Sequence, residues 1–65
     1  MEIINGYQVF EKEELNKENS IVVLSDMIQN LDRDIPSWNK GCGMRKIMEC
    51  QRDALYKAIT ALEYN

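Results

Sequence analysis

The sequence predicts a mostly α-helical, small α+β protein, in which an N-terminal β-hairpin is followed by an antiparallel helical hairpin. Two apolar patterns predict the helices: large aliphatic residues recur at three- and four-residue intervals from Ile21 to Ile35, and a second pattern runs from Met44 to Glu63. An Asn-Gly pair between two short β-prone runs predicts the hairpin. The chain of 65 residues is long enough for a single small domain, residues 1–65.

The hairpin is predicted over residues 1–10, with its turn at Asn5-Gly6. A type I′ turn needs positive φ angles at both central residues, which Asn and Gly adopt most readily. The register that follows has two cross-strand pairs, Glu2 with Val9 and Ile4 with Tyr7. Because both faces of this hairpin are partly apolar, and because an isolated hairpin is marginal in water, we expect one face to cover the helices or an edge of the hairpin to pair with another chain.

Residues 11–19 form a charged connector, which we interpret as a loop or a single helical turn. Asn19 and Ser20 are good N-cap residues, so we expect the first helix over residues 20–35. Pro36 ends this helix, because proline lacks an N–H group and restricts the residue before it. The apolar seam of the helix has the narrow spacing that helices use to pack against other helices, and it comprises Ile21, Leu24, Ile28, Leu31 and Ile35.

Residues 36–43 contain the single proline and two of the three glycines, and we interpret them as the turn between the helices. The second helix is expected over residues 44–63. A start at Ser37 is the alternative, but it would place Gly41 and Gly43 inside the helix at a cost of about 1 kcal/mol each relative to Ala.

The second helix has two apolar stripes. One is bulky (Met44, Met48, Leu55, Ile59 and Leu62), and the other has smaller members (Ile47, Ala54, Ala58 and Ala61). Together they are more apolar surface than one antiparallel helix needs to cover. This surplus favours either a dimeric four-helix arrangement or a target protein that covers the second stripe.

The net charge of −3 is unevenly distributed. Residues 1–35 have eight acidic and three basic side chains, a net −5, whereas residues 36–65 have three acidic and five basic side chains, a net +2. One interpretation is attraction between two packed halves, and the other is an acidic face that binds a basic partner. Nucleic-acid binding is disfavoured in both cases, because a phosphate backbone requires a net basic footprint.

No catalytic or ligand-binding motif is present, and the prediction is a non-enzymatic protein without metal or cofactor. The chain has no histidine, so a nucleophilic Cys42 or Cys50 would lack its usual base, and two thiolates are half of a structural zinc set. If both cysteines lie in one helix they are about 12 Å apart, too far for a disulfide. Unpaired cysteines, together with the lack of a signal-peptide or membrane-span pattern, predict a cytoplasmic location.

By elimination, the leading hypothesis is a small regulator or inhibitor that docks on a larger protein. Small acidic proteins of this type are often encoded by phages or mobile elements, and they act in the host cytoplasm by blocking a host protein such as a nuclease or defence enzyme. The predicted contact residues are four acids of the connector region and one aromatic residue, namely Glu11, Glu13, Glu14, Glu18 and Trp38. The alternative role of Trp38 is to plug the end of the helical core.

Two further hypotheses remain open. The first is structural: a homodimer or larger homo-oligomer whose helices form a bundle, since the core of so short a chain is marginal. The second, weaker hypothesis is nucleic-acid binding through basic residues of the second helix, which are Arg45, Lys46, Arg52 and Lys57.

Overall fold

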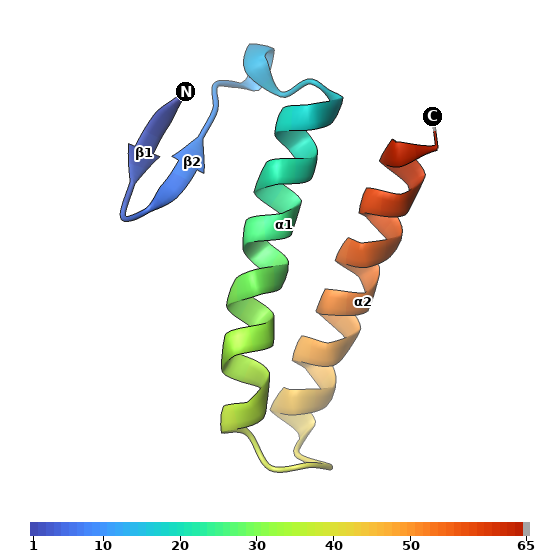
Figure 1. Ribbon diagram of the computed structural model, residues 1–65. Helices are drawn as coiled ribbons and strands as arrows, with labels where there is room; N and C mark the ends of the chain where they lie inside the picture. Colours follow the sequence, from blue (N-terminus) through green and yellow to red (C-terminus); the bar gives the residue numbers. More distant parts are fainter. Residues whose placement is uncertain (65) are drawn as a thin grey trace.

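A computed structural model describes residues 1–64 of the chain. Two short strands, β1 (Glu2–Ile4) and β2 (Tyr7–Val9), are followed by a 3₁₀ turn, η1 (Lys12–Glu14), and by helix α1 (Lys17–Asp34). A second 3₁₀ turn, η2 (Ile35–Ser37), leads through a loop to helix α2 (Gly43–Glu63). The two helices are antiparallel neighbours, and the hairpin lies on the other side of α1 (Figure 1). The predicted fold class is confirmed.

The hairpin has the predicted register. Strands β1 and β2 are antiparallel, with Glu2 opposite Val9 and Ile4 opposite Tyr7. The φ angles of Asn5 and Gly6 are 52° and 86°, as a type I′ turn requires. However, every strand residue is exposed. The expectation that one face of the hairpin covers the helices is therefore met only in part: β2 contacts α1, but Tyr7 and Val9 keep 38% and 39% of their surface exposed.

Helix α1 begins at Lys17, three residues before the predicted start, so the prediction that Asn19 or Ser20 caps it is wrong. The cap is Asn16, whose Oδ1 accepts a 2.8 Å hydrogen bond from the backbone amide of Asn19. The side chain of Asn19 instead donates a 2.7 Å hydrogen bond to the carbonyl of Glu14. The helix extends upstream of its apolar seam because a good N-cap residue is available there.

The turn between the helices confirms one of the two predicted starts for the second helix. Helix α1 ends at Asp34, directly before η2 and its Pro36. Helix α2 begins at Gly43, one residue before the preferred prediction. The alternative start at Ser37 is wrong, because Trp38 has extended backbone angles (φ −106°, ψ 141°) and Gly41 has a φ of 83°, so neither can continue a helix.

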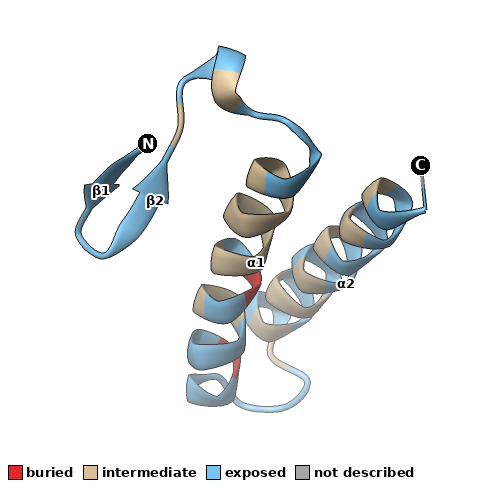
Figure 2. Cartoon of the chain, turned by 45° about the horizontal axis from the view of Figure 1, so that its top comes forward, coloured by how far each residue is buried: buried red, intermediate tan, exposed pale blue. Residues whose placement is uncertain are grey.

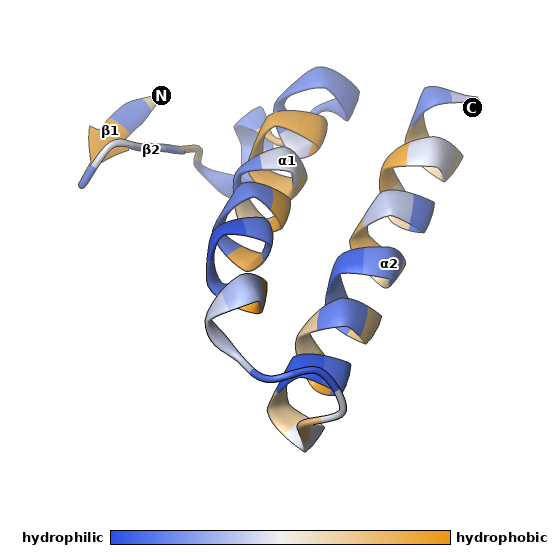
Figure 3. Ribbon diagram, turned by 60° about the horizontal axis from the view of Figure 1, so that its bottom comes forward, coloured by the Kyte–Doolittle hydropathy of each residue, from blue (hydrophilic) through white to orange (hydrophobic). Residues whose placement is uncertain are grey.

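The core of the described chain is very small. Ile28 and Ile35 are buried, with 5% and 4% of their surface exposed, and the rest of the α1 seam is half-buried. Ile28 of α1 and Ile35, the first residue of η2, both lie on the side that faces α2 (Figure 2). The strongly hydrophobic segments of the two helices also face each other (Figure 3). The bulky stripe of α2 contributes through Met48, Leu55, Ile59 and Leu62, which are all half-buried.

The hairpin, α1 and α2 lie side by side in a single layer. The principal extents of the Cα positions are 39 × 30 × 13 Å, so the molecule is a flat slab (Figure 1). Domains usually bury apolar surface between at least two layers of secondary structure. Because this chain has one layer, its helices remain uncovered on both broad faces of the slab.

Candidate protein-binding surface

Two of the predicted contact acids have structural roles within the chain. Glu11 and Glu14 form a capping box around η1, and the Glu14 carboxylate accepts a 2.9 Å hydrogen bond from the backbone amide of Glu11. The same carboxylate pairs with the N-terminal ammonium of Met1 at 2.9 Å. These two interactions, the backbone hydrogen bond above all, lower the pKa of Glu14 below its ordinary value. Binding a foreign partner through Glu14 would have to replace both interactions.

The structure does not bring the predicted contact residues together. Glu13 and Glu18 are exposed near the N-terminal end of α1, whereas Trp38 follows η2 at the opposite end. Helix α1 has 18 residues, a length of about 27 Å at 1.5 Å per residue. The four acids and Trp38 therefore cannot form one compact contact site.

Trp38 is neither a buried plug nor fully solvated, because 40% of its surface is exposed. Its carbonyl accepts a 2.9 Å hydrogen bond from the Arg45 guanidinium. Its side chain borders a shallow hollow shared with Asp34 and Met48. The plug interpretation of Trp38 is therefore only partly right: it covers the end of the helix pair from one side.

Part of the charge asymmetry is used between the two helices. The Arg52 guanidinium of the basic half lies 3.7 Å from the Asp32 carboxylate of the acidic half. A second contact between the helices, in which the Lys17 ammonium donates to the carbonyl of Glu63 at 3.4 Å, is independent of the asymmetry, because Lys17 belongs to the acidic half. Attraction between the acidic and basic halves was one of the two interpretations of the charge pattern. Such exposed pairs are each worth less than about 1 kcal/mol, so they orient the helices more than they hold them together.

The groove between the helices differs on the two broad faces of the slab. On one face it is polar, and its lining residues include Ser25, Gln29 and Asp32 of α1 with Tyr56, Thr60 and Glu63 of α2. On the other face it is apolar and lacks any charged lining residue. The lining residues there are Met27, Asn30 and Leu31 of α1 with Gln51, Ala54 and Leu55 of α2.

The apolar groove continues onto an exposed strip of α2. Viewed along the axis of α2, successive residues are about 100° apart. One arc of about 100° on this view contains no charged residue, and two rows of residues with seven-residue spacing lie within it. The rows are Met44, Gln51 and Ala58, and Ile47 with Ala54. Met44 and Ile47, towards the loop end of α2, are 42% and 53% exposed, and Met27 of α1, which lines the groove with Ala54 and Leu55, is 47% exposed. We call this surface the apolar face, and define it as Met27, Asn30, Leu31, Met44, Ile47, Gln51, Ala54, Leu55 and Ala58.

The smaller stripe predicted for α2 supplies three of the nine residues of the apolar face, Ile47, Ala54 and Ala58. The residues of this stripe are exposed in the structure. This agrees with the prediction that one partner helix cannot cover both stripes of α2. The contribution of Met27, Asn30 and Gln51 was missed. The seven-residue spacing of Met44, Gln51 and Ala58 is the signal that could have identified Gln51 as part of the same surface.

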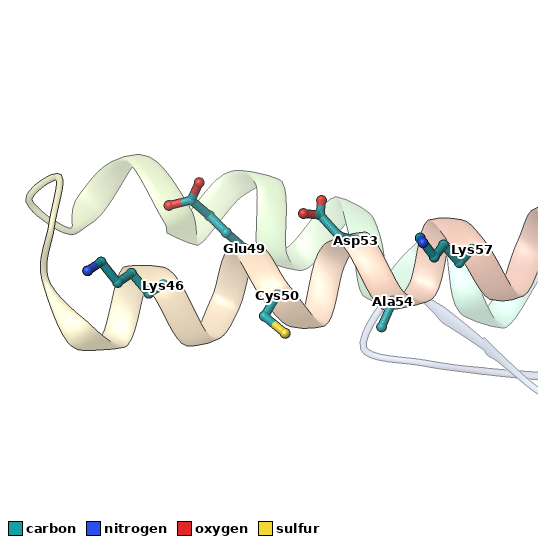
Figure 4. A pocket seen from close by; sticks show the side chains of 6 residues that line it. All are labelled: Lys46, Glu49, Cys50, Asp53, Ala54 and Lys57. Atoms are coloured by element: carbon teal, nitrogen blue, oxygen red, sulfur yellow. The ribbon is translucent and has the colours of Figure 1, made fainter.

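The outer edge of α2 carries a second hollow, which one helix forms by itself. Four charged side chains, Lys46, Glu49, Asp53 and Lys57, surround Cys50 and Ala54 there (Figure 4). Glu49 pairs with Arg45 at 3.4 Å as its i,i+4 spacing predicts, whereas Asp53 pairs with Arg52 at 3.4 Å rather than with Lys57. Cys50 and Cys42 are free thiols. This edge is an ordinary solvated helix surface.

Residues 1–64 contain no cluster of three or more His, Cys, Asp or Glu residues suited to a metal ion. In the same range, no helix combines the length and the apolar character that crossing a membrane requires. No protein-family model matches the chain, and no curated protein or solved structure shows significant similarity to it.

Proposed function

We propose that the chain is a small non-enzymatic regulator that works by protein–protein binding, and that the apolar face is its binding surface. One observation carries the proposal: the groove between the helices has no charged lining residue on this face, and three large hydrophobic residues of the apolar face, Met27, Met44 and Ile47, are 47%, 42% and 53% exposed. Scattered exposed hydrophobic residues are normal in soluble proteins. A contiguous set around a charge-free groove is instead typical of an interaction site.

The chemistry of the residues that line the groove also supports protein binding rather than catalysis. The apolar groove offers side-chain amides from Asn30 and Gln51 as its polar groups. Neither is a nucleophile or a titratable acid or base, so the groove has no group to move a proton or form a covalent bond. A groove between two helices, lined by apolar residues, is instead the shape that accepts the apolar side of another helix.

The binding surface proposed here differs from the acidic site predicted from the sequence. Glu11 and Glu14 are engaged in η1, and Trp38 lies at the far end of α1 from all four acids. The exposed acids Glu13 and Glu18 remain available near the N-terminal end of α1, where they can select against acidic partners. The apolar face supplies the area that binding requires.

The proposal is tested by placing a charge on each broad face in turn. Ala58→Glu puts a carboxylate on the apolar face, and Thr60→Glu puts the same carboxylate on the polar groove, where Thr60 is also exposed. Tagged wild-type chain and the two variants are used for affinity capture from cells of the source organism, with mass spectrometry of the bound proteins. We expect Ala58→Glu to lose the captured protein and Thr60→Glu to retain it. Equal capture by all three folded chains would contradict the proposal.

A further inference from the structure

We infer that the partner on the apolar face is a second copy of this chain, bound through antiparallel pairing of the two α2 helices about a two-fold axis at Gln51. The inference rests on the proposed function, because it names the occupant of the same surface. Four properties of the chain support it: its surface area, its shape, the order of large and small residues along α2, and the position of its charges.

The chain exposes more surface than a folded monomer of its mass normally does. Its accessible surface is 5028 Å² at 7.6 kDa, whereas the scaling of folded monomers gives about 4,300 Å² for this mass. The excess is roughly 700 Å², close to the ~800 Å² that each partner contributes to a standard interface. If one additional chain covered one face, the accessible surface of each chain would therefore fall to the value that is usual for a folded protein of this mass.

The radius of gyration of the chain also indicates an assembly of two copies. The Cα radius of gyration is 13.5 Å, whereas a compact chain of this length should have about 11 Å and a compact assembly of twice the length about 14 Å. Stacking two slabs face to face adds a second layer at the usual interhelical distance of about 8–10 Å. The assembly then has the two layers that bury apolar surface in ordinary domains.

The order of residues along α2 makes its exposed strip complementary to itself. The bulky members, Met44 and Ile47, precede Gln51, and the small members, Ala54 and Ala58, follow it. Met44 is seven residues before Gln51 and Ala58 is seven after, so antiparallel pairing about Gln51 places Met44 of one copy opposite Ala58 of the other. Ile47 similarly meets the region of Ala54. Large residues opposite small ones allow close helix packing, and a parallel pair would oppose Met44 to Met44 instead.

The charges permit this pairing. Each copy has a net charge of −3, which disfavours self-association unless the charged groups lie away from the contact. No charged residue lines the apolar groove or falls within the exposed arc of α2. On α1 the Arg33 guanidinium reaches the rim of the groove, where it donates to Asn30 at 2.7 Å, and its charge is partly compensated by the Asp34 carboxylate at 4.0 Å. The side-chain amide of Gln51 makes no hydrogen bond to the described part of its own chain. On the two-fold axis it can form a hydrogen bond with the side-chain amide of Gln51 of the second copy. Such a buried amide pair fixes the register of helix pairs.

The first test is the mass of the protein in solution. An interface of this size has a dissociation constant of micromolar or below, so at about 100 µM the wild-type chain should sediment as a dimer. Ala58→Glu should weaken association by more than about 30-fold, because two unpaired carboxylates would be buried. Thr60→Glu should leave it unchanged. Loss of the fold in Ala58→Glu alone has the same meaning, because residue 58 is exposed in a single chain and tolerates Glu unless a second copy covers it.

The second test locates the axis. In a chain that carries Cys42→Ser and Cys50→Ser, the further substitution Gln51→Cys should give a disulfide-linked dimer under mild oxidation, because the two symmetry-related positions on the axis are adjacent. The matched control is Gln29→Cys, which lies in the polar groove. Equal rates of cross-linking, or a wild-type mass of 7.6 kDa at about 100 µM, would overturn the inference. The proposed function would survive a monomeric result if capture of a different protein still depended on Ala58, and would fall with it if capture did not.

Discussion

The hydroxyl of Tyr7 in β2 donates a 2.6 Å hydrogen bond to Oδ1 of Asn30 in α1. The same oxygen accepts a 2.7 Å hydrogen bond from the Arg33 guanidinium one turn later. Asn30 also lines the apolar groove. A single amide therefore connects the hairpin, which buries little surface of its own, to the rim of the proposed binding surface.

Tyr7→Phe should loosen the hairpin while leaving the helices intact. A hydrogen bond of this kind contributes about 0.5–1.5 kcal/mol, so the loss in unfolding free energy should be about 1 kcal/mol or less. Hydrogen exchange of the β2 amides should accelerate more than that of the α1 amides. Tyr56→Phe is the control, because Tyr56 is similarly exposed (49% against 38%). Equal acceleration in both variants would mean that the Tyr7 hydroxyl does not hold the hairpin.

The Glu14 carboxylate should make the N-terminal region sensitive to acid. Its pKa is lowered in the folded chain, chiefly by the hydrogen bond from the Glu11 amide and secondly by the N-terminal ammonium. A group with a lowered folded pKa stabilises the fold above its unfolded pKa, about 4.3 for glutamate, and loses this contribution as the pH falls through the folded pKa.

This expectation is checked by an NMR titration of the Glu14 side chain, with N-terminal acetylation as the comparison. Acetylation removes the ammonium, so the pKa should rise towards its ordinary value without reaching it, because the Glu11 amide still donates. Glu14→Gln should reduce the loss of stability between about pH 5 and pH 3. A Glu14 pKa at or above the ordinary glutamate value of about 4.3 would contradict the assignment.

Asn16→Ala should destabilise the first turn of α1. The Asn16 side chain is the N-cap, and replacing a capping Asn by Ala costs about 1 kcal/mol. The measurement is urea unfolding followed by circular dichroism. Asn39→Ala is a suitable control, because Asn39 lies in the loop between the helices and contributes its carbonyl rather than its side chain to a hydrogen bond. A similar loss in both variants would argue against the cap.

Gly41, in the loop between the helices, and Gly43, the first residue of α2, should respond to alanine in opposite directions. Gly41 has a φ of 83°, a left-handed conformation that costs an L-residue about 1–2 kcal/mol, so Gly41→Ala should destabilise. Gly43 is the first residue of α2 and Gly43→Ala should stabilise by about 0.5 kcal/mol. A methyl group at either position meets no atom within 4 Å, so backbone conformation alone decides the sign. Thermal unfolding of the two variants checks the order.

Local sequence signals predicted the elements of this fold, and the errors lie where a signal has more than one reading. Asn5-Gly6 fixed the hairpin register because few other residues tolerate two positive φ angles. The start of α1 was misplaced because Asn16, Asn19 and Ser20 are all good N-cap residues. The apolar seam begins at Ile21 and carries no information about how far the polar end of the helix extends.

The candidate site depended on three-dimensional arrangement, and the sequence supplied only part of it. Four acids and Trp38 were grouped because each suits an interface, although the predicted helix over residues 20–35 already required a separation of about 24 Å. The exposure of the smaller stripe of α2 followed from its position beside the bulky one. Which broad face of the slab is apolar depends on the rotation of α1 against α2, which places Met27 and Leu31 beside Ala54 and Leu55.

The central claim is that the apolar face is covered by a second copy, and four methionines provide the most direct measurement. Met1 is 62% exposed, Met27 and Met44 lie on the apolar face, and Met48 is half-buried between the helices. The methionine methyl groups are labelled with ¹³C, and a soluble paramagnetic agent broadens the NMR signals of those that solvent reaches. In the dimer, the Met1 signal should broaden, whereas the signals of Met27 and Met44 should be protected as well as that of Met48. In Ala58→Glu, Met27 and Met44 should lose this protection while Met48 keeps it. Broadening of Met27 and Met44 to the extent of Met1 in the wild-type chain would contradict the claim.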